Sequence, residues 1–208
     1  MDRKLVGIVL FKDVEVLDFC GPFEVFSATR LNEDSRREEP SPYEVILVAE
    51  KNNAVVAAGG MKVLPDYVFE NCPKLDILVV PGGWGIREEL KNIAMRDWLR
   101  ARSSEVETLT SVCTGSMLLG NAGLLHGLSA TTHWRSLEWM RELFPDVTVE
   151  IDKRVVEEGR IITSAGISAG IDMALRVVAR HHGEGVARAT AMHMEYPYPE
   201  NNDRRVNL

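Results

Sequence analysis

The sequence predicts an α/β fold in which helices surround a mainly parallel sheet. Short, continuous apolar runs such as residues 4–11 and 76–80 have the pattern of strands that are buried on both faces. Helical patterns alternate with these runs, and the longest of them covers residues 168–182. Because crossover helices cover both faces of a parallel sheet, this alternation predicts a layered sandwich.

The first half of the chain begins with the strand at 4–11 and a helix at 17–28. The polar and charged residues 32–41 then predict a surface loop. Further apolar runs, separated by the turn residues Asn52-Asn53 and Gly59-Gly60, predict strands at 43–48, 61–64 and 76–80 and helices at 86–92 and 94–102.

The second half continues with a strand over 106–112 and a helix directly after it. The remaining patterns predict a helix at 135–143, short strands at 147–151, 154–157 and 161–163, and helices at 168–182 and 185–194. Residues 196–202 contain two prolines, which exclude a helix and favour a tail that lies over the surface.

Composition limits the classes of function. With 208 residues, 45% of them hydrophobic, the chain is expected to form one domain over 1–208. A net charge of −7 argues against nucleic-acid partners and anionic membrane surfaces. Three cysteines, an odd number, suit a reducing cytoplasm, and no apolar run approaches the roughly 20 residues of a membrane span. We therefore expect a cytoplasmic protein.

Cys113 is the candidate nucleophile. The β-type run ends at Cys113, and Thr114-Gly115-Ser116 and an apolar helical pattern follow at once. A side chain at such a strand-to-helix corner stands at the tip of a sharp turn, as in a nucleophile elbow. The helix N-terminus is expected to lower the pKa of the thiol. The alternative is a packing cysteine, since a free cysteine behaves as a small hydrophobe.

Two further segments follow strands and should lie at the same edge of the sheet as Cys113. Asp18 is flanked by apolar residues, which raises the pKa of a carboxyl and suits an acid that serves Cys113; a helix cap is the alternative, and Glu24 is the rival carboxylate. Gly82 and Gly83 form either a simple turn or a site where backbone N–H groups stabilise negative charge.

His133 is either the base of a Cys–His pair or a structural histidine at a helix start. The sequence has no CxxC pair and no HExxH motif, so no metal site is expected. It also lacks GxGxxG and P-loop patterns, so no nucleotide cofactor is expected.

Taken together, the motifs resemble the ThiJ/PfpI superfamily of class I glutamine-amidotransferase-like proteins, and most closely its isonitrile hydratase branch. The matching segments are Leu17-Asp18-x-x-Gly21-Pro22, Pro81-Gly82-Gly83, Ser111-Val112-Cys113-Thr114-Gly115-Ser116, Ala130-Thr131-Thr132-His133-Trp134 and Ala165-Gly166-Ile167-Ser168-Ala169-Gly170-Ile171-Asp172. The resemblance implies a flavodoxin-like three-layer sandwich with a cysteine nucleophile elbow, and a homodimer.

The residues around the nucleophile select the branch. PfpI-type peptidases place a histidine directly after the cysteine, where this chain has Thr114. The hydratase branch pairs its cysteine with an aspartate of the first helix and has threonine next, which Asp18, Cys113 and Thr114 match.

The resemblance therefore implies hydration of a small-molecule isonitrile to an N-substituted formamide. Cys113 would form a thioimidate, Asp18 would serve as acid and base, and Gly83 and Thr114 would hold developing charge. The expected pocket walls are Trp134, Gly166 and Ile167.

One segment departs from that branch. The hydratase is glycine-rich before its Ile-Thr-Ala-Gly-Ile-Asp, whereas this chain has Ser164-Ala165-Gly166-Ile167-Ser168, a spelling that also resembles the sensor domains of helix-turn-helix regulators. Three other functions stay open: glyoxalase- or deglycase-like chemistry on carbonyl adducts, a redox sensor based on Cys113 oxidation, and a ligand-binding domain.

Overall fold

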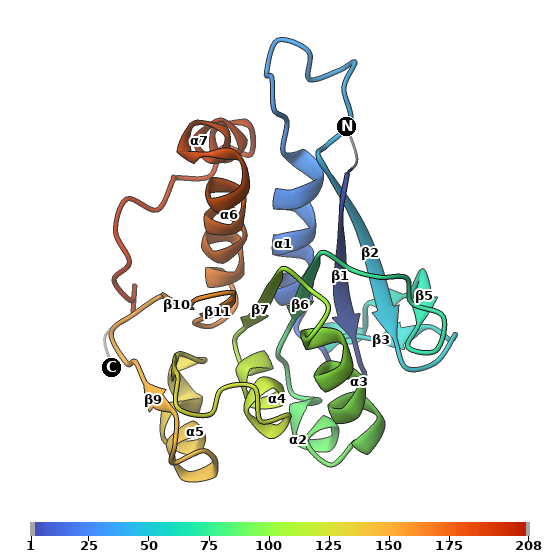
Figure 1. The fold of residues 1–208 in the computed structure, drawn as a ribbon, viewed down its shortest axis with the longest axis vertical. Coiled ribbons are helices and arrows are strands. Elements are labelled where there is room, and N and C mark those ends of the chain that lie inside the picture. Colours follow the sequence, from blue (N-terminus) through green and yellow to red (C-terminus); the bar gives the residue numbers. More distant parts are fainter. Residues whose placement is uncertain (1–2, 207–208) are drawn as a thin grey trace.

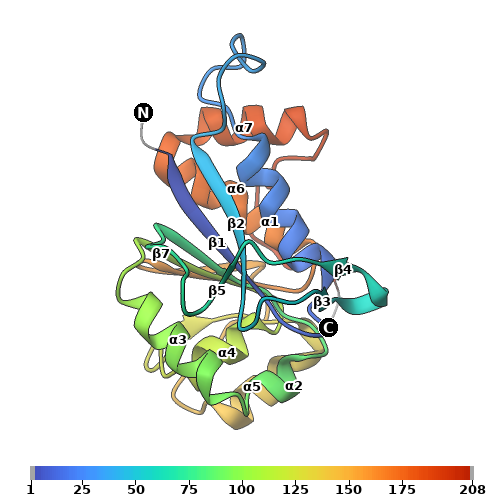
Figure 2. The same ribbon diagram turned by 90° about the vertical axis from the view of Figure 1, so that its right-hand side faces the viewer.

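A seven-stranded sheet divides the molecule into three layers. The computed structural model describes residues 3–206. Helices α1 (Val16–Ala28), α6 (Ala169–His182) and α7 (Glu184–His193) pack together on one face of the sheet (Figures 1 and 2). The opposite face carries α2 (Ile86–Glu89), α3 (Ile93–Ser103), α4 (Gly115–Asn121) and α5 (Leu137–Leu143). The predicted three-layer α/β sandwich is confirmed.

The strand order places the carboxyl ends of the central strands side by side. From edge to edge the sheet contains β10 (Val155–Glu158), β11 (Ile161–Ser164), β7 (Thr108–Val112), β6 (Ile77–Val80), β1 (Lys4–Leu10), β2 (Tyr43–Ala49) and β5 (Tyr67–Val68). All neighbours are parallel except β10 and β11. Val80 of β6 pairs with Ser111 of β7, so the turn after β6 meets the residues that follow β7.

Smaller elements connect the main ones. Two short pairs join β3 (Val55–Val56) to β4 (Lys62–Val63) and β8 (Ser129–Ala130) to β9 (Thr148–Val149), and 3-10 turns cover Ala58–Gly60 and Trp134–Ser136.

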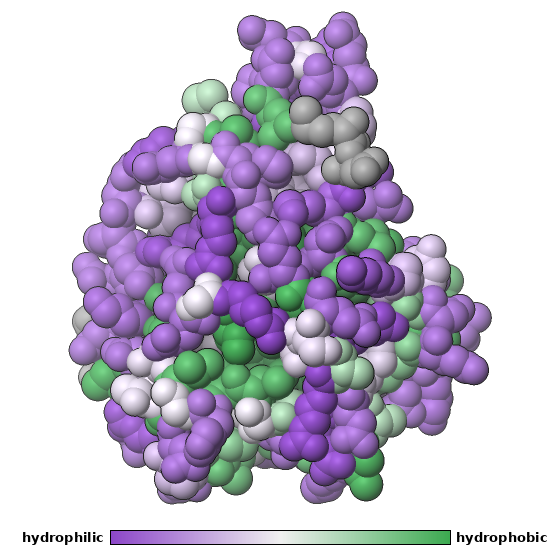
Figure 3. Space-filling model, viewed as in Figure 1, coloured by the Kyte–Doolittle hydropathy of each residue, from purple (hydrophilic) through white to green (hydrophobic). Residues whose placement is uncertain are grey.

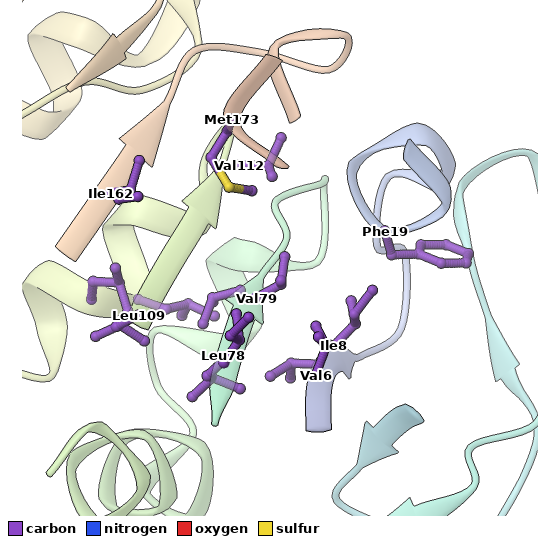
Figure 4. Packing of buried hydrophobic residues seen from close by; sticks show 14 of the residues in the cluster. Val6, Ile8, Phe19, Leu78, Val79, Leu109, Val112, Ile162 and Met173 are labelled. Carbon is purple, nitrogen blue, oxygen red and sulfur yellow. The ribbon is translucent and has the colours of Figure 1, made fainter. Parts of the chain in front are cut away.

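The core lies between the sheet and the helices on both of its faces. Val79 of β6 and Val112 of β7 are completely buried, and Phe19 of α1 and Met173 of α6 are almost or completely so (Figure 4). Burying an apolar side chain of this size stabilises the fold by about 1.5–3 kcal/mol. At Gly170, a Cβ would come within 3.0 Å of the Val112 side chain, so α6 crosses β7 closely at the end of β7 that bears the site.

Most predicted elements are present with their ends shifted by a few residues. The helix expected from residue 135 begins at Leu137 after a 3-10 turn, and the helix expected over 86–92 already ends at Glu89. The sequence did not predict β5 and β8, two-residue strands that form because a neighbouring strand offers backbone partners.

The predicted loop and tail both lie on the surface. The loop around residues 31–40 protrudes at the top of Figure 3 and is almost entirely hydrophilic. The tail after α7 returns to the sheet edge, where both backbone groups of Val155 hydrogen-bond the Asn202 side chain. Within residues 3–206, no helix combines the length and apolar character that crossing a membrane requires.

Candidate active site

Cys113 occupies a sharp corner between β7 and α4. Its φ of 56° lies in the left-handed region, which is uncommon for a residue with a side chain and costs on the order of 1–3 kcal/mol. Two residues later, a Cβ on Gly115 would lie 2.0 Å from the carbonyl oxygen of Val80, so only glycine lets α4 begin this close to β6. The strand, strained cysteine and helix form the predicted nucleophile elbow.

Asp18 lies in the first turn of α1, completely buried. Its Oδ2 accepts a hydrogen bond from the Gly82 N–H at 2.9 Å. Its Oδ1 is buried without a conventional hydrogen-bond partner, and the side chain that interacts with the carboxyl group is the Cys113 thiol. The rival carboxylate, Glu24, is exposed, so Asp18 is the carboxyl group that the fold brings to the elbow.

Burial raises the pKa of Asp18 from 3.8 to about 8. The Gly82 N–H opposes this rise, the negative charge of Glu15 adds to it, and the Cys113 side chain opposes it. The sequence-based expectation of a raised pKa agrees with this environment, which favours a carboxylic acid at neutral pH.

The thiol behaves differently from expectation. The helix N-terminus was expected to lower its pKa, but burial and then the charge of Asp18 raise the pKa of Cys113 well above its ordinary value. Hydrogen bonds from the Thr114 N–H, the Thr114 hydroxyl and the Ile167 N–H oppose the rise without overcoming it. Because Asp18 and Cys113 act on each other's pKa, the protonation of one group affects the titration of the other.

The turn formed by Gly82 and Gly83 hydrogen-bonds the Asp18 carboxyl and the Thr114 hydroxyl. Its two N–H groups donate within the protein, that of Gly82 to Asp18 and that of Gly83 to the Thr114 hydroxyl oxygen at 3.1 Å. A Cβ on Gly82 would lie 2.5 Å from the backbone nitrogen of Thr114, so the turn packs directly against the elbow. Gly82 and Gly83 therefore act through Asp18 and Thr114 in this arrangement.

A cavity of about 450 Å³ opens in front of Cys113. Two of the expected walls, Trp134 and Ile167, line it. Gly166 lies beside it, where a Cβ would meet the His133 ring at 2.2 Å.

His133 also lines the cavity, and burial lowers its pKa, so its imidazole is neutral at pH 7. Its Nδ1 accepts a hydrogen bond from the Arg135 N–H at 3.2 Å, in the manner of a cap on the following turn. The partners of the thiol are instead Asp18, Thr114 and Ile167. This arrangement favours the structural interpretation of His133.

Sequence reasoning missed several cavity residues. Trp84 and Trp139 add aromatic walls, Arg87 and Arg135 add positive charge, and Glu15 adds a carboxylate. Arg87 lies 5.2 Å from the ring centre of Trp139, a cation–π arrangement. Their positions in the sequence could have indicated two of these residues, since Trp84 directly follows Gly83 and Glu15 stands three residues before Asp18. Within residues 3–206, no group of three or more His, Cys, Asp or Glu side chains is arranged to hold a metal ion.

Comparison with known proteins agrees with this geometry. The model of the DJ-1/PfpI family matches residues 4–180. The chain belongs to the DJ-1/PfpI family. An isonitrile hydratase from Pseudomonas putida is 34% identical over 192 residues, which cover 92% of this chain and 78% of that protein. The transcriptional regulator GbdR from Pseudomonas aeruginosa is 35% identical over 135 residues, 65% of this chain but 36% of the regulator.

Solved structures of the family share the fold. A ThiJ/PfpI family protein from Pseudomonas syringae superposes with a TM-score of 0.83 at 28% identity and covers 97% of this chain and 79% of its own. Drosophila melanogaster DJ-1beta gives a TM-score of 0.79 at 21% identity, with 94% and 100% coverage. The flavodoxin-like sandwich of this DJ-1/PfpI protein is therefore shared with its relatives.

Proposed function

We propose that the protein is an isonitrile hydratase, which adds water to an isonitrile to give an N-substituted formamide. The observation that carries the proposal is the buried Asp18 carboxyl, with a pKa of about 8 and an unpartnered Oδ1, against the Cys113 thiol. Isonitrile hydration through a thioimidate needs both a sulfur nucleophile and a proton for the carbon that the sulfur attacks. A pair that shares protons between sulfur and carboxyl supplies both.

The reactive form of the pair holds one proton, with Asp18 as the acid and Cys113 as the thiolate. The sulfur attacks the terminal isonitrile carbon and forms a C–S bond, while Asp18 transfers its proton to the same carbon. The product is a thioimidate, and Asp18 is left ionised. General acid assistance of this kind contributes about 10²–10⁴-fold to a rate.

Water completes the reaction at the thioimidate carbon. Ionised Asp18 takes a proton from the attacking water and passes it to the nitrogen. The new hydroxyl then returns a proton to Asp18 as its oxygen forms the carbonyl group, the C–S bond breaks, and the thiolate leaves. Asp18 and Cys113 regain their starting protonation, and the N-substituted formamide is released.

The donors around the sulfur support this sequence. The Thr114 N–H and hydroxyl and the Ile167 N–H all lower the pKa of Cys113, so each favours the thiolate over the thiol. The aromatic walls formed by Trp84, Trp134 and Trp139 suit an apolar organic substituent on the isonitrile nitrogen.

The relatives support an enzyme and leave room for a sensor, since both an isonitrile hydratase and transcriptional regulators resemble the chain. A sensor that responds by oxidation needs an accessible thiolate. Cys113 is 6% exposed, which weighs against that function. As part of the same proposal, we infer a cytoplasmic homodimer, which size-exclusion chromatography with light scattering would test.

The deciding experiment follows the turnover of a simple aryl isonitrile by the ultraviolet absorbance of its formamide. Wild type is compared with Cys113→Ala and with Cys72→Ala, a matched loss of a buried thiol that lies in another part of the core. We expect activity in the wild type and in Cys72→Ala, and none in Cys113→Ala. An inactive wild type refutes the proposal and favours carbonyl-adduct chemistry, tested with methylglyoxal, or a ligand-binding role.

A further inference from the structure

Ile167 occupies an unusual conformation next to the nucleophile. Its φ is 53°, in the left-handed region, where a β-branched side chain is a genuine outlier. Its side chain is 37% exposed, so core packing does not hold it there. Its N–H nevertheless acts on the Cys113 thiol, whose pKa it lowers, and both residues line the same cavity. Something other than local preference must hold the backbone in place.

Arg154 forms hydrogen bonds at both ends of the segment that contains Ile167. The carbonyl oxygen of Arg154 accepts a hydrogen bond from the Ala165 N–H at 2.8 Å. Its guanidinium donates from Nη2 to the Ser168 hydroxyl oxygen at 3.1 Å. Gly166 and Ile167 are the two residues between these contacts. One residue, through its backbone carbonyl and its side chain, therefore contacts both ends of the segment that contains Ile167.

Asp172 fixes the direction of that guanidinium. Arg154 Nε donates to Asp172 Oδ2, and the two side chains are 7% and 1% exposed. The C-terminal tail adds two partners to the Asp172 carboxylate. The Tyr196 hydroxyl donates to Oδ1 at 2.6 Å, and Arg205 lies 3.1 Å from Oδ2. A buried arginine that is paired in this way has little freedom to point elsewhere.

We propose that Arg154, aimed by Asp172, is the positioning residue for the nucleophile, because it holds the Ile167 N–H on the sulfur of Cys113 through Ser168. The inference deepens the proposed function, because it concerns the same thiol. It also assigns a use to a buried ion pair that the chemistry does not require. Nothing in the group touches the cavity directly except Ile167, so its effect passes through the backbone.

Ser168→Ala is the sharpest test, because Ser168 is exposed and the change leaves the ion pair intact. The readout is the pH dependence of Cys113 alkylation by iodoacetamide, followed by mass spectrometry of the peptide that contains Cys113. We expect the midpoint to rise by about half a unit to one unit, because a hydrogen bond to the charged sulfur is weakened. The thermal unfolding temperature should be unchanged.

Two serine variants provide the controls. Ser168→Thr keeps the hydroxyl and should restore the wild-type midpoint. Ser136→Ala makes the same chemical change at a residue that lines the cavity and should leave the midpoint unchanged. Asp18, Glu15 and His133 lie near the same thiol in every variant, so only the difference between profiles is interpreted.

Asp172→Asn tests the aiming of Arg154. If the variant folds, its alkylation midpoint should rise at least as far as that of Ser168→Ala; if it fails to fold, Ser168→Ala decides alone. A Ser168→Ala profile that coincides with wild type overturns the inference, as does an equal shift in Ser136→Ala. Alkylation requires no isonitrile, so a wild type that is inactive on isonitriles refutes the proposed function and leaves this inference to its own test.

Discussion

The Asp18→Asn variant separates the proposed catalytic role of the buried carboxyl from its effect on stability. Asparagine has nearly the same shape, and its oxygen can still accept the Gly82 N–H that now binds Oδ2. It cannot ionise. The variant therefore resembles the protonated acid but cannot donate and recover a proton, and we expect turnover to fall by about 10²–10⁴-fold.

The magnitude of the stability effect follows from the pKa of Asp18, which is 3.8 ordinarily and about 8 in the folded protein. Above pH 3.8 the unfolded chain loses a proton that the folded protein keeps until about pH 8, so the free energy of unfolding decreases as the pH rises through this range. Each pH unit lowers the free energy of unfolding by about 1.4 kcal/mol, which amounts to about 4 kcal/mol between pH 5 and pH 8. Asp18→Asn removes this dependence.

Urea unfolding of both proteins at several pH values between 5 and 8 measures the effect. The free energy of unfolding of the variant minus that of wild type should increase by about 4 kcal/mol across the range. Glu24→Gln, which removes an exposed carboxylate on the same helix, serves as the control. Its free energy of unfolding should differ from that of wild type by a constant amount across the pH range. A constant difference for Asp18→Asn would mean that Asp18 is ionised in the folded protein, which would remove it as the acid.

The same site supports further predictions. The value of kcat/KM for the isonitrile should rise with pH as the Asp18–Cys113 pair loses its first proton, with a midpoint near the pKa of about 8 of Asp18. A flat profile from pH 6 to 9 would contradict a proton shared by Asp18 and Cys113. Asp18→Asn should make Cys113 alkylation faster above about pH 8, where Asp18 is ionised in wild type and its charge raises the pKa of the thiol; slower alkylation in that range would contradict this. Gly82→Ala should destabilise the fold by about 1–3 kcal/mol in thermal unfolding, because the new Cβ would lie 2.5 Å from the Thr114 nitrogen. Gly185→Ala is the control and should not destabilise the fold, because a Cβ at that position meets no atom within 4 Å. Trp84→Ala, which removes a side chain that is 72% exposed, should raise KM for an aryl isonitrile while leaving the unfolding temperature unchanged.

The elements that carry the site could be predicted because their signals lie within short segments. Buried parallel strands appear as continuous apolar runs, and the elbow appears as a strand that ends at Cys113 before small residues and a helix. The apolar neighbours of Asp18 already indicated burial and a raised pKa. Parallel topology then brings the ends of β6 and β7 to one edge, which explains why the glycine turn was expected beside the cysteine.

The chemical state of the thiol depended on the tertiary structure. The helix N-terminus is a local feature and favours a thiolate, but burial and Asp18 act through space and raise the pKa of Cys113. Likewise, the N–H groups of Gly82 and Gly83 were expected to face developing charge, and the fold directs them to Asp18 and Thr114. Partner choice among hydrogen-bonding groups is decided by distance, which sequence spacing does not report for separate segments.

By itself, the sequence determined the order of the main strands and helices, the elbow at Cys113 and the burial of Asp18, because each depends on the hydrophobic pattern and turn residues of one contiguous segment. Only the tertiary structure decided which side chains line the cavity and how Ile167 is held. Trp84 and Trp139 line the same cavity although 55 positions separate them in the sequence, and Arg154, Asp172 and the tail come together from three separate segments. Such contacts form when loop closure places distant residues together, and no local pattern encodes them.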